Sequence, residues 1–301
     1  MRKHLKRGRV VLAAISVVAL AALGLAGSAQ AKLTGEFTKF QFCPYTKAEV
    51  RRCIYSPTTG GEVKLGKKVV PIEKEVVLQG GYGEEAETGT EAGFAKFYEA
   101  TNGVTLSKAA QNVPGGLAGI VPEASSPPLV KALIKFFFEN KITGLTSTLE
   151  LAKPASEIRV SEIHLAEEIG VALKMPVKVH LENPFLGKSC YVGSSSSPIN
   201  WNLTVGTTAP PKPNEPIKGT GGVTEFFEEG QILKLKGAEL VDNAWSAPAP
   251  SGCGGILSFL VNPIISSQLG ATTAGNNTAK LKNDIWESPA LAVKINNEEH
   301  P

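Results

Sequence analysis

The chain has 301 residues, with 31 basic and 28 acidic side chains and a formal net charge of +3. Five of the basic residues and none of the acidic ones lie in the first 31 residues, so residues 32–301 hold 26 basic and 28 acidic side chains, a net charge of −2. This balance leaves no basic patch of the kind that nucleic-acid binding needs, and we expect no nucleic-acid partner. Asp242 and Asp284 are the only aspartates, which excludes Asp-rich calcium loops.

The first 31 residues have the pattern of a secretory signal peptide. Five basic residues precede an apolar run at 10–27, and Ala29-Gln30-Ala31 forms a cleavage site before Lys32. The 17 residues from Val10 to Ala26 are about the lower limit for crossing a bilayer core, so an uncleaved signal anchor is the alternative. We predict a cleaved signal peptide over 1–31. The protein is then secreted or lies in the cell envelope, with no stable membrane span after cleavage.

Four cysteines, Cys43, Cys53, Cys190 and Cys253, follow this leader. An even number in an exported protein favours two disulfides. Of the three possible pairings we expect Cys43–Cys53, which spans a short turn-rich segment, and Cys190–Cys253. The spacings offer no CxxC-like ligand pairs, which disfavours a metal site. A nucleophilic Cys253 among the glycines of 251–255 is the alternative to the second disulfide.

Short strands separated by turns dominate the pattern along the chain. The strands that we predict are Phe37–Phe42, Glu62–Leu65, Lys68–Ile72, Glu75–Leu78, Leu145–Leu151, Ile158–Leu165, Val171–Leu181, Ile199–Val205, Val223–Phe227 and Ile232–Leu235. In Val171–Leu181 apolar residues occupy every odd position, which is typical of a strand with one buried face. Pro176 cannot donate a ladder hydrogen bond there, which predicts an edge strand or a bulge. A change of apolar phase at Ser161-Glu162 predicts a β-bulge in Ile158–Leu165.

Two helices complete the predicted elements. Ser126 is expected to cap the first, with Pro127 and Pro128 in its first turn and apolar pairs recurring every four residues to Phe138. Leu133 and Phe137 should be buried, with Lys131 and Lys135 exposed. The helix either packs on a sheet or touches a membrane with Phe136–Phe138. A weaker helix over Ile256–Leu269 should be broken or kinked at Pro263.

These elements predict a mainly β fold, an antiparallel β-sandwich or barrel with one or two accessory helices. The proline-rich segment 209–216 is either a loop or a domain boundary. A Cys190–Cys253 bond would close across it, so we favour a loop. Residues 32–301 are then expected to form a single disulfide-stapled β-rich domain.

No segment has a convincing catalytic or cofactor-binding motif. Gly81-Tyr82-Gly83-Glu84-Glu85-Ala86 loosely fits a dinucleotide fingerprint, but the acidic sequence that follows would repel phosphate. His164 lies near Glu167 and Glu168 without the HExxH spacing, and no G-x-S-x-G elbow is present. We therefore assign no catalytic, cofactor-binding or metal-binding residue and expect no cofactor.

Aromatic residues offer one further interpretation. Trp201, Trp245 and Trp286, with Tyr82 and Tyr191, either line a carbohydrate or apolar groove or belong to the core.

Four segments resemble exported actinobacterial proteins of unassigned function: Asn183–Gly193, Val241–Ala244, Gly252–Gly254 and Gly275–Ala279. The resemblance spans roughly Val177 to Leu281. It implies export and supports the pairing of Cys190 with Cys253. It brings no activity and no site residue.

Together these observations predict a secreted, non-enzymatic binding or structural module of the cell envelope or extracellular space. Its partner would be a cell-wall component or an apolar small molecule. A secreted hydrolase with a Ser/His or carboxylate site assembled by the fold is one alternative, and a carrier of an apolar ligand is another. An apolar cavity would favour the carrier. Convergent carboxylates in a cleft, or His164 beside an acid, would favour the hydrolase, and a filled core would favour the structural module.

Overall fold

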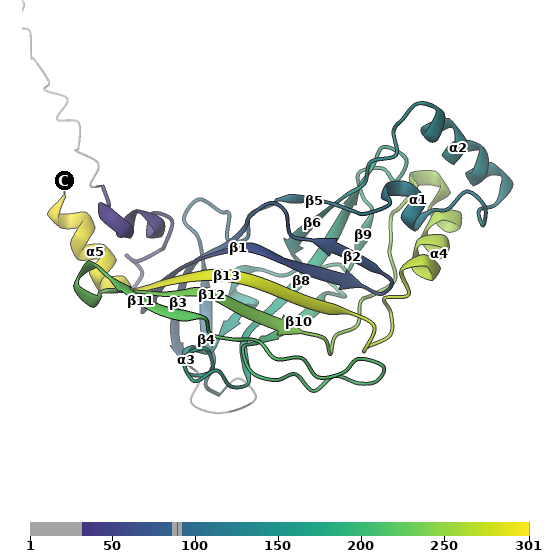
Figure 1. Ribbon diagram of the computed structural model, residues 1–301. Helices are drawn as coiled ribbons and strands as arrows, with labels where there is room; N and C mark the ends of the chain where they lie inside the picture. Colours follow the sequence, from purple (N-terminus) through teal and green to yellow (C-terminus); the bar gives the residue numbers. More distant parts are fainter. Residues whose placement is uncertain (1–31, 86–88, 90–91, 301) are drawn as a thin grey trace, which may run out of the picture.

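The structure is a computed structural model that describes residues 32–85, 89 and 92–300 (Figure 1). The predicted signal peptide, residues 1–31, lies outside this part of the chain. No helix in the described ranges is long and apolar enough to cross a membrane.

Eight antiparallel strands close into a barrel, which confirms the predicted mainly β fold (Figure 1). Around the barrel the strands follow the order β8 (Val171–Glu182), β10 (Ile199–Thr204), β12 (Ile232–Asp242), β13 (Thr278–Pro289), β1 (Arg52–Leu65), β3 (Val76–Glu85), β4 (Ala95–Glu99) and β7 (Arg159–Val160). The ring closes because β8 pairs with β7 along one edge and with β10 along the other. Closure removes the exposed edges that an open sheet would present.

Five further strands extend the barrel wall. They are β2 (Lys68–Pro71) on β1, β11 (Val223–Phe227) on β12, β6 (Thr146–Leu151) and β9 (Tyr191–Val192) on β8, and β5 (Ala110–Asn112) on β6.

The helices lie mainly at the two ends of the barrel (Figure 1). One end carries α1 (Gly116–Ile120), α2 (Pro128–Glu139) and α4 (Ser258–Leu269), and the other carries α5 (Ala290–Glu299) and the 3-10 helix η1 (Gly35–Phe40). A short helix, α3 (Glu162–Ala166), links β7 to β8. Three further 3-10 turns are η2 (Ala155–Glu157), η3 (Glu228–Gly230) and η4 (Gly255–Leu257).

The predicted strand Phe37–Phe42 is wrong, because η1 occupies this segment. Phe37 and Phe40 are both buried. They lie three residues apart, and this is the spacing that aligns side chains on one side of a 3-10 helix.

The predicted bulge in Ile158–Leu165 is also wrong. The strand β7 holds only Arg159 and Val160, and α3 follows at once. The Ser161 hydroxyl accepts a hydrogen bond from the His164 backbone N–H at 3.4 Å and caps this helix. The change of apolar phase therefore marks the boundary between a strand and a helix.

Pro176 lies in the middle of a strand that is paired on both sides, which corrects the predicted edge position. It stands opposite Asn200 of β10, and its carbonyl accepts the Ala152 N–H at 3.0 Å on the other side. The pairing on that side passes from β7 at Lys174 to β6 at Val177. The missing N–H of Pro176 therefore falls in the gap between two partner strands.

Both predicted helices are present, with changes in detail. Ser126 does not cap α2, because its hydroxyl donates to the Pro122 carbonyl at 2.7 Å. Val130 and Ile134 are the fully buried residues of α2, while Leu133 and Phe137 are half-buried and pack against the core. Lys131 and Lys135 are exposed as expected. Pro263 lies inside α4 without ending the helix.

The two predicted disulfides are present, Cys43–Cys53 and Cys190–Cys253, with Cα–Cα distances of 5.5 and 4.1 Å. The second bond closes across 209–216. Within that segment the Asn214 side-chain amide donates to the carbonyls of Asn243 and Asn277, both at 2.8 Å. These bonds attach the proline-rich segment to the ends of β12 and β13.

Candidate ligand-binding site

The barrel contains an apolar cavity of about 110 Å³. Of the 30 residues that line it, 24 are apolar and none is aromatic. The interior of an eight-stranded barrel is just wide enough to be filled by side chains or to hold one small ligand. Because no aromatic ring reaches this interior, the smaller side chains that line it leave a space that larger rings would have filled.

Three helices, α1, α3 and α4, contribute to the lining of the cavity. Ile120 of α1 and Leu269 of α4 contribute to its lining at the end that carries these helices. Val160 of β7 and Leu165 of α3 line it elsewhere. Part of the cavity wall is therefore made by helices rather than by the strands of the barrel.

Six polar residues line the cavity: Ser56, Thr58, Lys68, Gln111, Ser147 and Asn283. The Thr58 hydroxyl donates to the Asn283 side-chain oxygen at 2.6 Å, and the Asn283 amide donates to the Leu281 carbonyl at 2.9 Å. Gln111 bonds to the backbone of Glu73 and Lys74. Lys68 is the only charged lining residue and has no ion pair within the described part of the chain.

A polar cluster, buried at Tyr82 and Glu287 and partly exposed at Arg52 and Glu162, lies one row beyond the apolar lining. It consists of Arg52, Tyr82, Glu162 and Glu287. Arg52 is two residues from Ile54 and Glu287 is two residues from Ile285, and both isoleucines line the cavity. Alternate residues of a strand share a face, so Arg52 and Glu287 point into the barrel. Arg52 forms an ion pair with Glu162, which begins α3.

Burial dominates the electrostatics of this cluster. Burial and, to a smaller extent, the negative charge of Glu162 raise the pKa of Glu287, while Arg52 and Tyr82 lower it, and the net result is a pKa of about 7. Burial also raises the pKa of Tyr82 well above its ordinary value. The Tyr82 hydroxyl and both carboxyl oxygens of Glu287 have no well-formed hydrogen bond among the described residues. The cluster can therefore hold a proton inside the barrel near neutral pH, but none of its members lines the cavity.

His164 has structural contacts rather than an acidic partner. Its Nδ1 atom lies 2.7 Å from the Val171 carbonyl, and its ring packs edge to face on Phe94 at 5.8 Å. No hydrogen bond or ion pair joins it to Glu167 or Glu168 within the described residues.

The histidine that lies beside acidic side chains is His180 and not His164. The sequence did not indicate this arrangement. Its Nδ1 atom lies 4.0 Å from Glu150 and 3.9 Å from Glu182, and its ring stacks on Tyr191 at 4.3 Å. Burial alone would raise the pKa of Glu150, but hydrogen bonds from Lys108 and Lys178 lower it. A carboxyl held in its ionised form is poorly suited to act as a general acid. Glu182 shares β8 with His180, whereas Glu150 lies on β6 and reaches His180 only because β6 pairs with β8.

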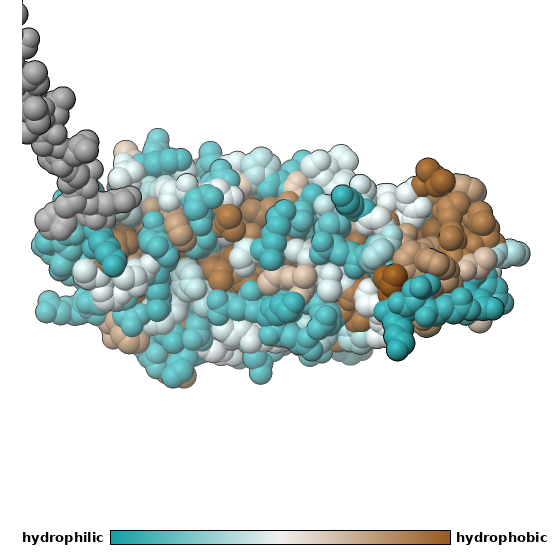
Figure 2. All heavy atoms as spheres, turned by 90° about the horizontal axis from the view of Figure 1, so that it is seen from above, coloured by the Kyte–Doolittle hydropathy of each residue, from teal (hydrophilic) through white to brown (hydrophobic). Residues whose placement is uncertain are grey.

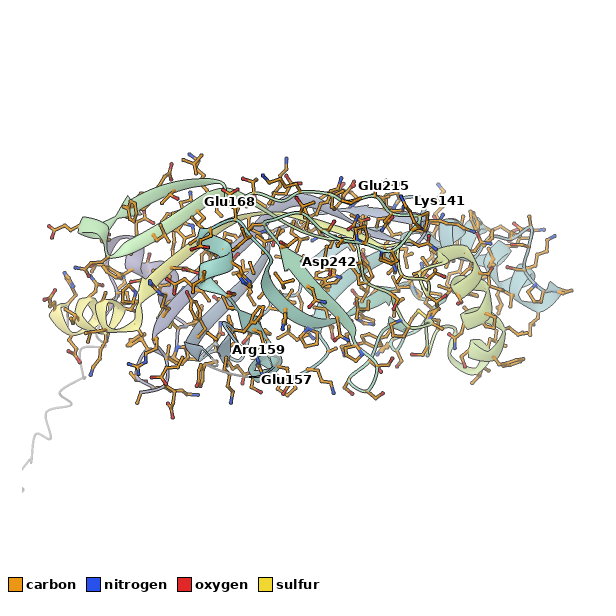
Figure 3. The ribbon with its side chains drawn as sticks, turned by 90° about the horizontal axis from the view of Figure 1, so that it is seen from below. Lys141, Glu157, Arg159, Glu168, Glu215 and Asp242 are labelled. Atoms are coloured by element: carbon orange, nitrogen blue, oxygen red, sulfur yellow. A yellow bond between two sulfur atoms is a disulfide. The ribbon has the colours of Figure 1, made fainter. Side chains whose placement is uncertain are left out.

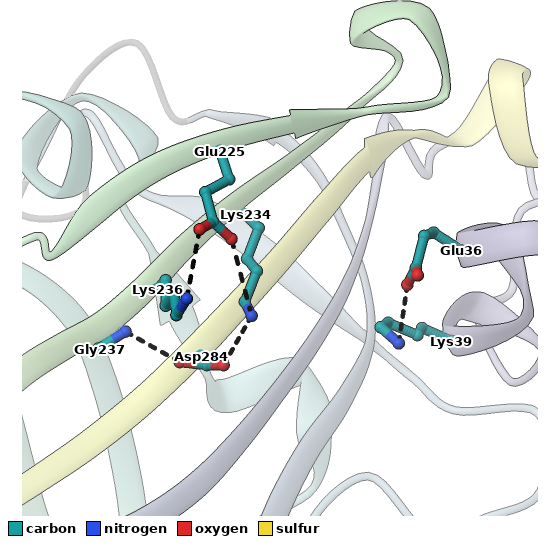
Figure 4. A network of polar contacts seen from close by, with 7 residues as sticks. All are labelled: Glu36, Lys39, Glu225, Lys234, Lys236, Gly237 and Asp284. Atoms are coloured by element: carbon teal, nitrogen blue, oxygen red, sulfur yellow. Dashed lines mark hydrogen bonds and ion pairs between the residues drawn. The ribbon is translucent and has the colours of Figure 1, made fainter.

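The two aspartates stabilise turns and strand ends. Asp242 accepts the backbone N–H groups of Asn202 and Ala244 at 2.7 and 2.9 Å, and burial raises its pKa (Figure 3). Asp284 pairs with Lys234 at 2.8 Å and accepts the Gly237 N–H at 2.8 Å (Figure 4). Neither bonds to a histidine in the described residues, so no Ser-His-Asp arrangement is assembled there.

The loose dinucleotide pattern at Gly81–Glu85 lies within β3, where it forms neither the loop nor the helix that phosphate binding needs. Its sixth residue, Ala86, lies outside the described residues. A Cβ atom on Gly81 would lie 2.6 Å from a Val50 methyl group and 3.0 Å from the Arg52 carbonyl. The glycine therefore permits close packing of the chain against β3.

The tryptophans belong to the core. Trp201 and Trp245 are buried and pack edge to face at 6.0 Å, and Trp286 packs on Phe227 at 5.1 Å. Cys253 is bonded to Cys190 and cannot act as a free thiol nucleophile.

A second hollow of about 380 Å³ lies beside β8 and β10. Charged and polar side chains make up much of its lining, including Glu157 and Arg159, which lie together in Figure 3. Arg159 donates to the carbonyls of Ser156 and Ile158 at 2.6 and 3.0 Å. The cavity inside the barrel has the apolar lining expected of a small-molecule site, and we take it as the candidate.

The sequence matches no protein-family model, and no curated protein or solved structure shows significant similarity to it.

Proposed function

We propose that this protein is an exported, non-enzymatic binding protein whose barrel holds one small apolar molecule. The observation that carries the proposal is the aliphatic cavity of about 110 Å³ inside the closed barrel. An engineered apolar cavity of about 150 Å³ stays dry and binds benzene, so a site of this size suits a small ring or a short alkyl chain. Export is supported by the two disulfides and by the charge and cleavage pattern of the first 31 residues.

Lys68 narrows the class of ligand. A half-buried lysine without an ion pair among the described residues, in the lining of an apolar space, favours a molecule with one anionic end. A short-chain carboxylate combines these two properties. Its alkyl chain would replace the empty space, and its carboxylate would pair with the lysine.

Binding of benzene, hexanol and hexanoate tests the proposal. Each probe should raise the midpoint of thermal unfolding, since a ligand that binds only the folded state stabilises it by about 2.7 kcal/mol at a hundredfold excess over Kd. Val70→Phe should abolish this effect by filling the cavity that Val70 lines. Val69→Phe is the matched control, because Val69 is the exposed neighbour on the same strand. Lys68→Met should weaken hexanoate binding and leave hexanol binding unchanged.

The proposal is contradicted if none of the three probes stabilises the protein. It is equally contradicted if Val70→Phe and Val69→Phe respond alike, because binding would then take place outside the barrel.

A further inference from the structure

One end of the barrel carries an unusual amount of exposed apolar surface. Figure 2 shows hydrophobic side chains gathered over this end, where α2 and α4 lie. Six of the 14 large apolar side chains that are exposed among the described residues belong to it: Leu129, Phe136, Phe138, Ile142, Ile256 and Phe259. Ile256 is 93% exposed and Phe259 is 70% exposed. A group of this kind on a folded protein marks an interaction surface.

Two contacts join the two parts of this surface. The Phe137 ring of α2 packs on Phe185 at 5.4 Å. The next residue, Leu186, accepts the Gly254 N–H at 2.8 Å, just before Ile256. The exposed side chains of α2 and of the chain entering α4 therefore belong to one continuous end of the molecule. We call it the apolar end.

The charges around the apolar end have one predominant sign. The segments that build it, 65–68, 113–145, 184–190 and 251–270, contain six lysines and two glutamates. Lys67 and Lys68 belong to it because the Lys67 N–H donates to the Leu269 carbonyl of α4 at 2.7 Å. Residues 32–301 as a whole carry a net charge of −2, so this end is positive on a molecule that is otherwise negative. No charged residue lies between Asp242 and Lys280, which leaves α4 without a charged side chain.

We propose that the apolar end docks on the surface of an anionic lipid bilayer. Exposed phenylalanine and isoleucine side chains would enter the boundary between headgroups and acyl chains, while lysines around them would pair with lipid phosphates. The combination favours lipid over a second copy of this chain, because two positive ends would repel each other. The inference does not require the cavity to bind a ligand. If it does, α1 and α4 would face the membrane from which an apolar molecule could enter.

Sedimentation with lipid vesicles tests the proposal on the exported chain. The protein should bind phosphatidylcholine vesicles that contain phosphatidylglycerol, bind pure phosphatidylcholine vesicles much more weakly, and dissociate as salt rises. Ile256→Ser combined with Phe259→Ser should lower the partition coefficient at least about tenfold. Val223→Ser combined with Phe226→Ser is the control, because these side chains are 64% and 68% exposed on β11. This control should bind as the unaltered protein does.

The lysine contribution has its own matched pair of variants. Lys131→Gln combined with Lys135→Gln should weaken binding on the order of tenfold to thirtyfold, since each lysine near an anionic surface contributes about 1 kcal/mol. Lys47→Gln combined with Lys294→Gln removes the same charge at other sites. The two pairs are alike because Lys135 and Lys294 each face a glutamate one helical turn away, at 3.9 and 3.8 Å. Equal loss in both pairs would show that net charge, and not the apolar end, governs binding.

Three results overturn the proposal. The first is the absence of binding to phosphatidylglycerol vesicles, and the second is equal binding to both kinds of vesicle. The third is a dimer in sedimentation velocity that Ile256→Ser with Phe259→Ser dissociates, which would assign the apolar end to a second copy of the chain. All variants should keep the unaltered unfolding midpoint, because the replaced side chains are exposed.

Discussion

Glu287 couples the proton concentration to the stability of the barrel. In the unfolded chain its pKa is close to the ordinary glutamate value, whereas burial beside Glu162 raises it to about 7 in the fold. Between these two values the folded state binds more protons than the unfolded state. The stability that protonated Glu287 provides is therefore complete below the unfolded pKa, and it is lost as the pH rises through about 7.

Replacement of this one carboxyl should flatten the pH dependence of folding. Between about pH 4.5 and about pH 8, we expect the titration of Glu287 to lower the free energy of unfolding by on the order of 3 kcal/mol. The magnitude follows because a difference of one pKa unit corresponds to about 1.36 kcal/mol. Glu287→Gln cannot ionise and should remove most of that slope. Urea denaturation across this pH range measures the effect. Exposed Glu298→Gln serves as the control, and an unchanged slope in Glu287→Gln would assign the dependence to another group.

Among the elements, the sequence predicts strands well where turn residues flank them, as Gly221-Gly222 precede β11 and Asn183-Pro184 follow β8. The boundaries of β11 agree with the prediction, and those of β8 differ by one residue. The strand β13, with 12 residues, is not predicted at all, although it lies between β1 and β12. Its interior positions include Asn283 and Glu287, which interrupt the apolar alternation set by Leu281 and Ile285. The partners of these polar residues lie on β1 and β3, and no local pattern reveals such distant partners.

The sequence predicts that the interior of the fold is apolar, but it does not predict the cavity inside it. The aliphatic composition of the strands indicates an apolar core, but the space within it depends on how side chains from many strands meet. Val63 and Val70 face each other across β1 and β2, for example, while Leu203 reaches the cavity from β10. A missing ring among such residues leaves a cavity, whereas one added ring would close it. The apolar end has a clearer sequence signal, because Phe136 and Phe138 lie on different sides of α2.

The buried side of α2 makes a sharp prediction about stability. Ile134 is fully buried, whereas Leu129 on the same helix is 55% exposed. Ile134→Ala should lower the free energy of unfolding by about 2–5 kcal/mol, as large-to-small changes in a packed core do. Leu129→Ala should change it by less than about 0.5 kcal/mol. Chemical denaturation compares the two variants, and equal effects would mean that α2 does not pack as described.

At the scale of the molecule, the barrel separates two chemically different regions. The cluster of Arg52, Tyr82, Glu162 and Glu287 lies beyond one part of the cavity lining. Toward the apolar end, α1 and α4 cover the cavity. An apolar molecule that entered past this cluster would have to separate charged side chains from their partners without replacing those contacts, which is costly. Neither α1 nor α4 contains a charged residue, so a path between them meets no charged side chain of these helices. Entry of a ligand is therefore expected beside α1 and α4, at the end that also carries Lys68.

The disulfide Cys190–Cys253 attaches the start of this helical end to β8 and β9, and its removal should destabilise the whole molecule. Both sulfurs are buried, and the bond closes a loop with a sequence separation of 63 residues, against 10 for Cys43–Cys53. In the chain-entropy model the longer loop contributes about 4 kcal/mol and the shorter one about 3 kcal/mol. Replacing both Cys190 and Cys253 by Ser should thus lower the unfolding free energy more than replacing both Cys43 and Cys53. Denaturant titration of the two double variants, each free of reactive thiols, measures the difference. A smaller loss for the 190/253 pair would mean that the proline-rich segment 209–216 and its asparagine contacts hold this region together without the covalent bond.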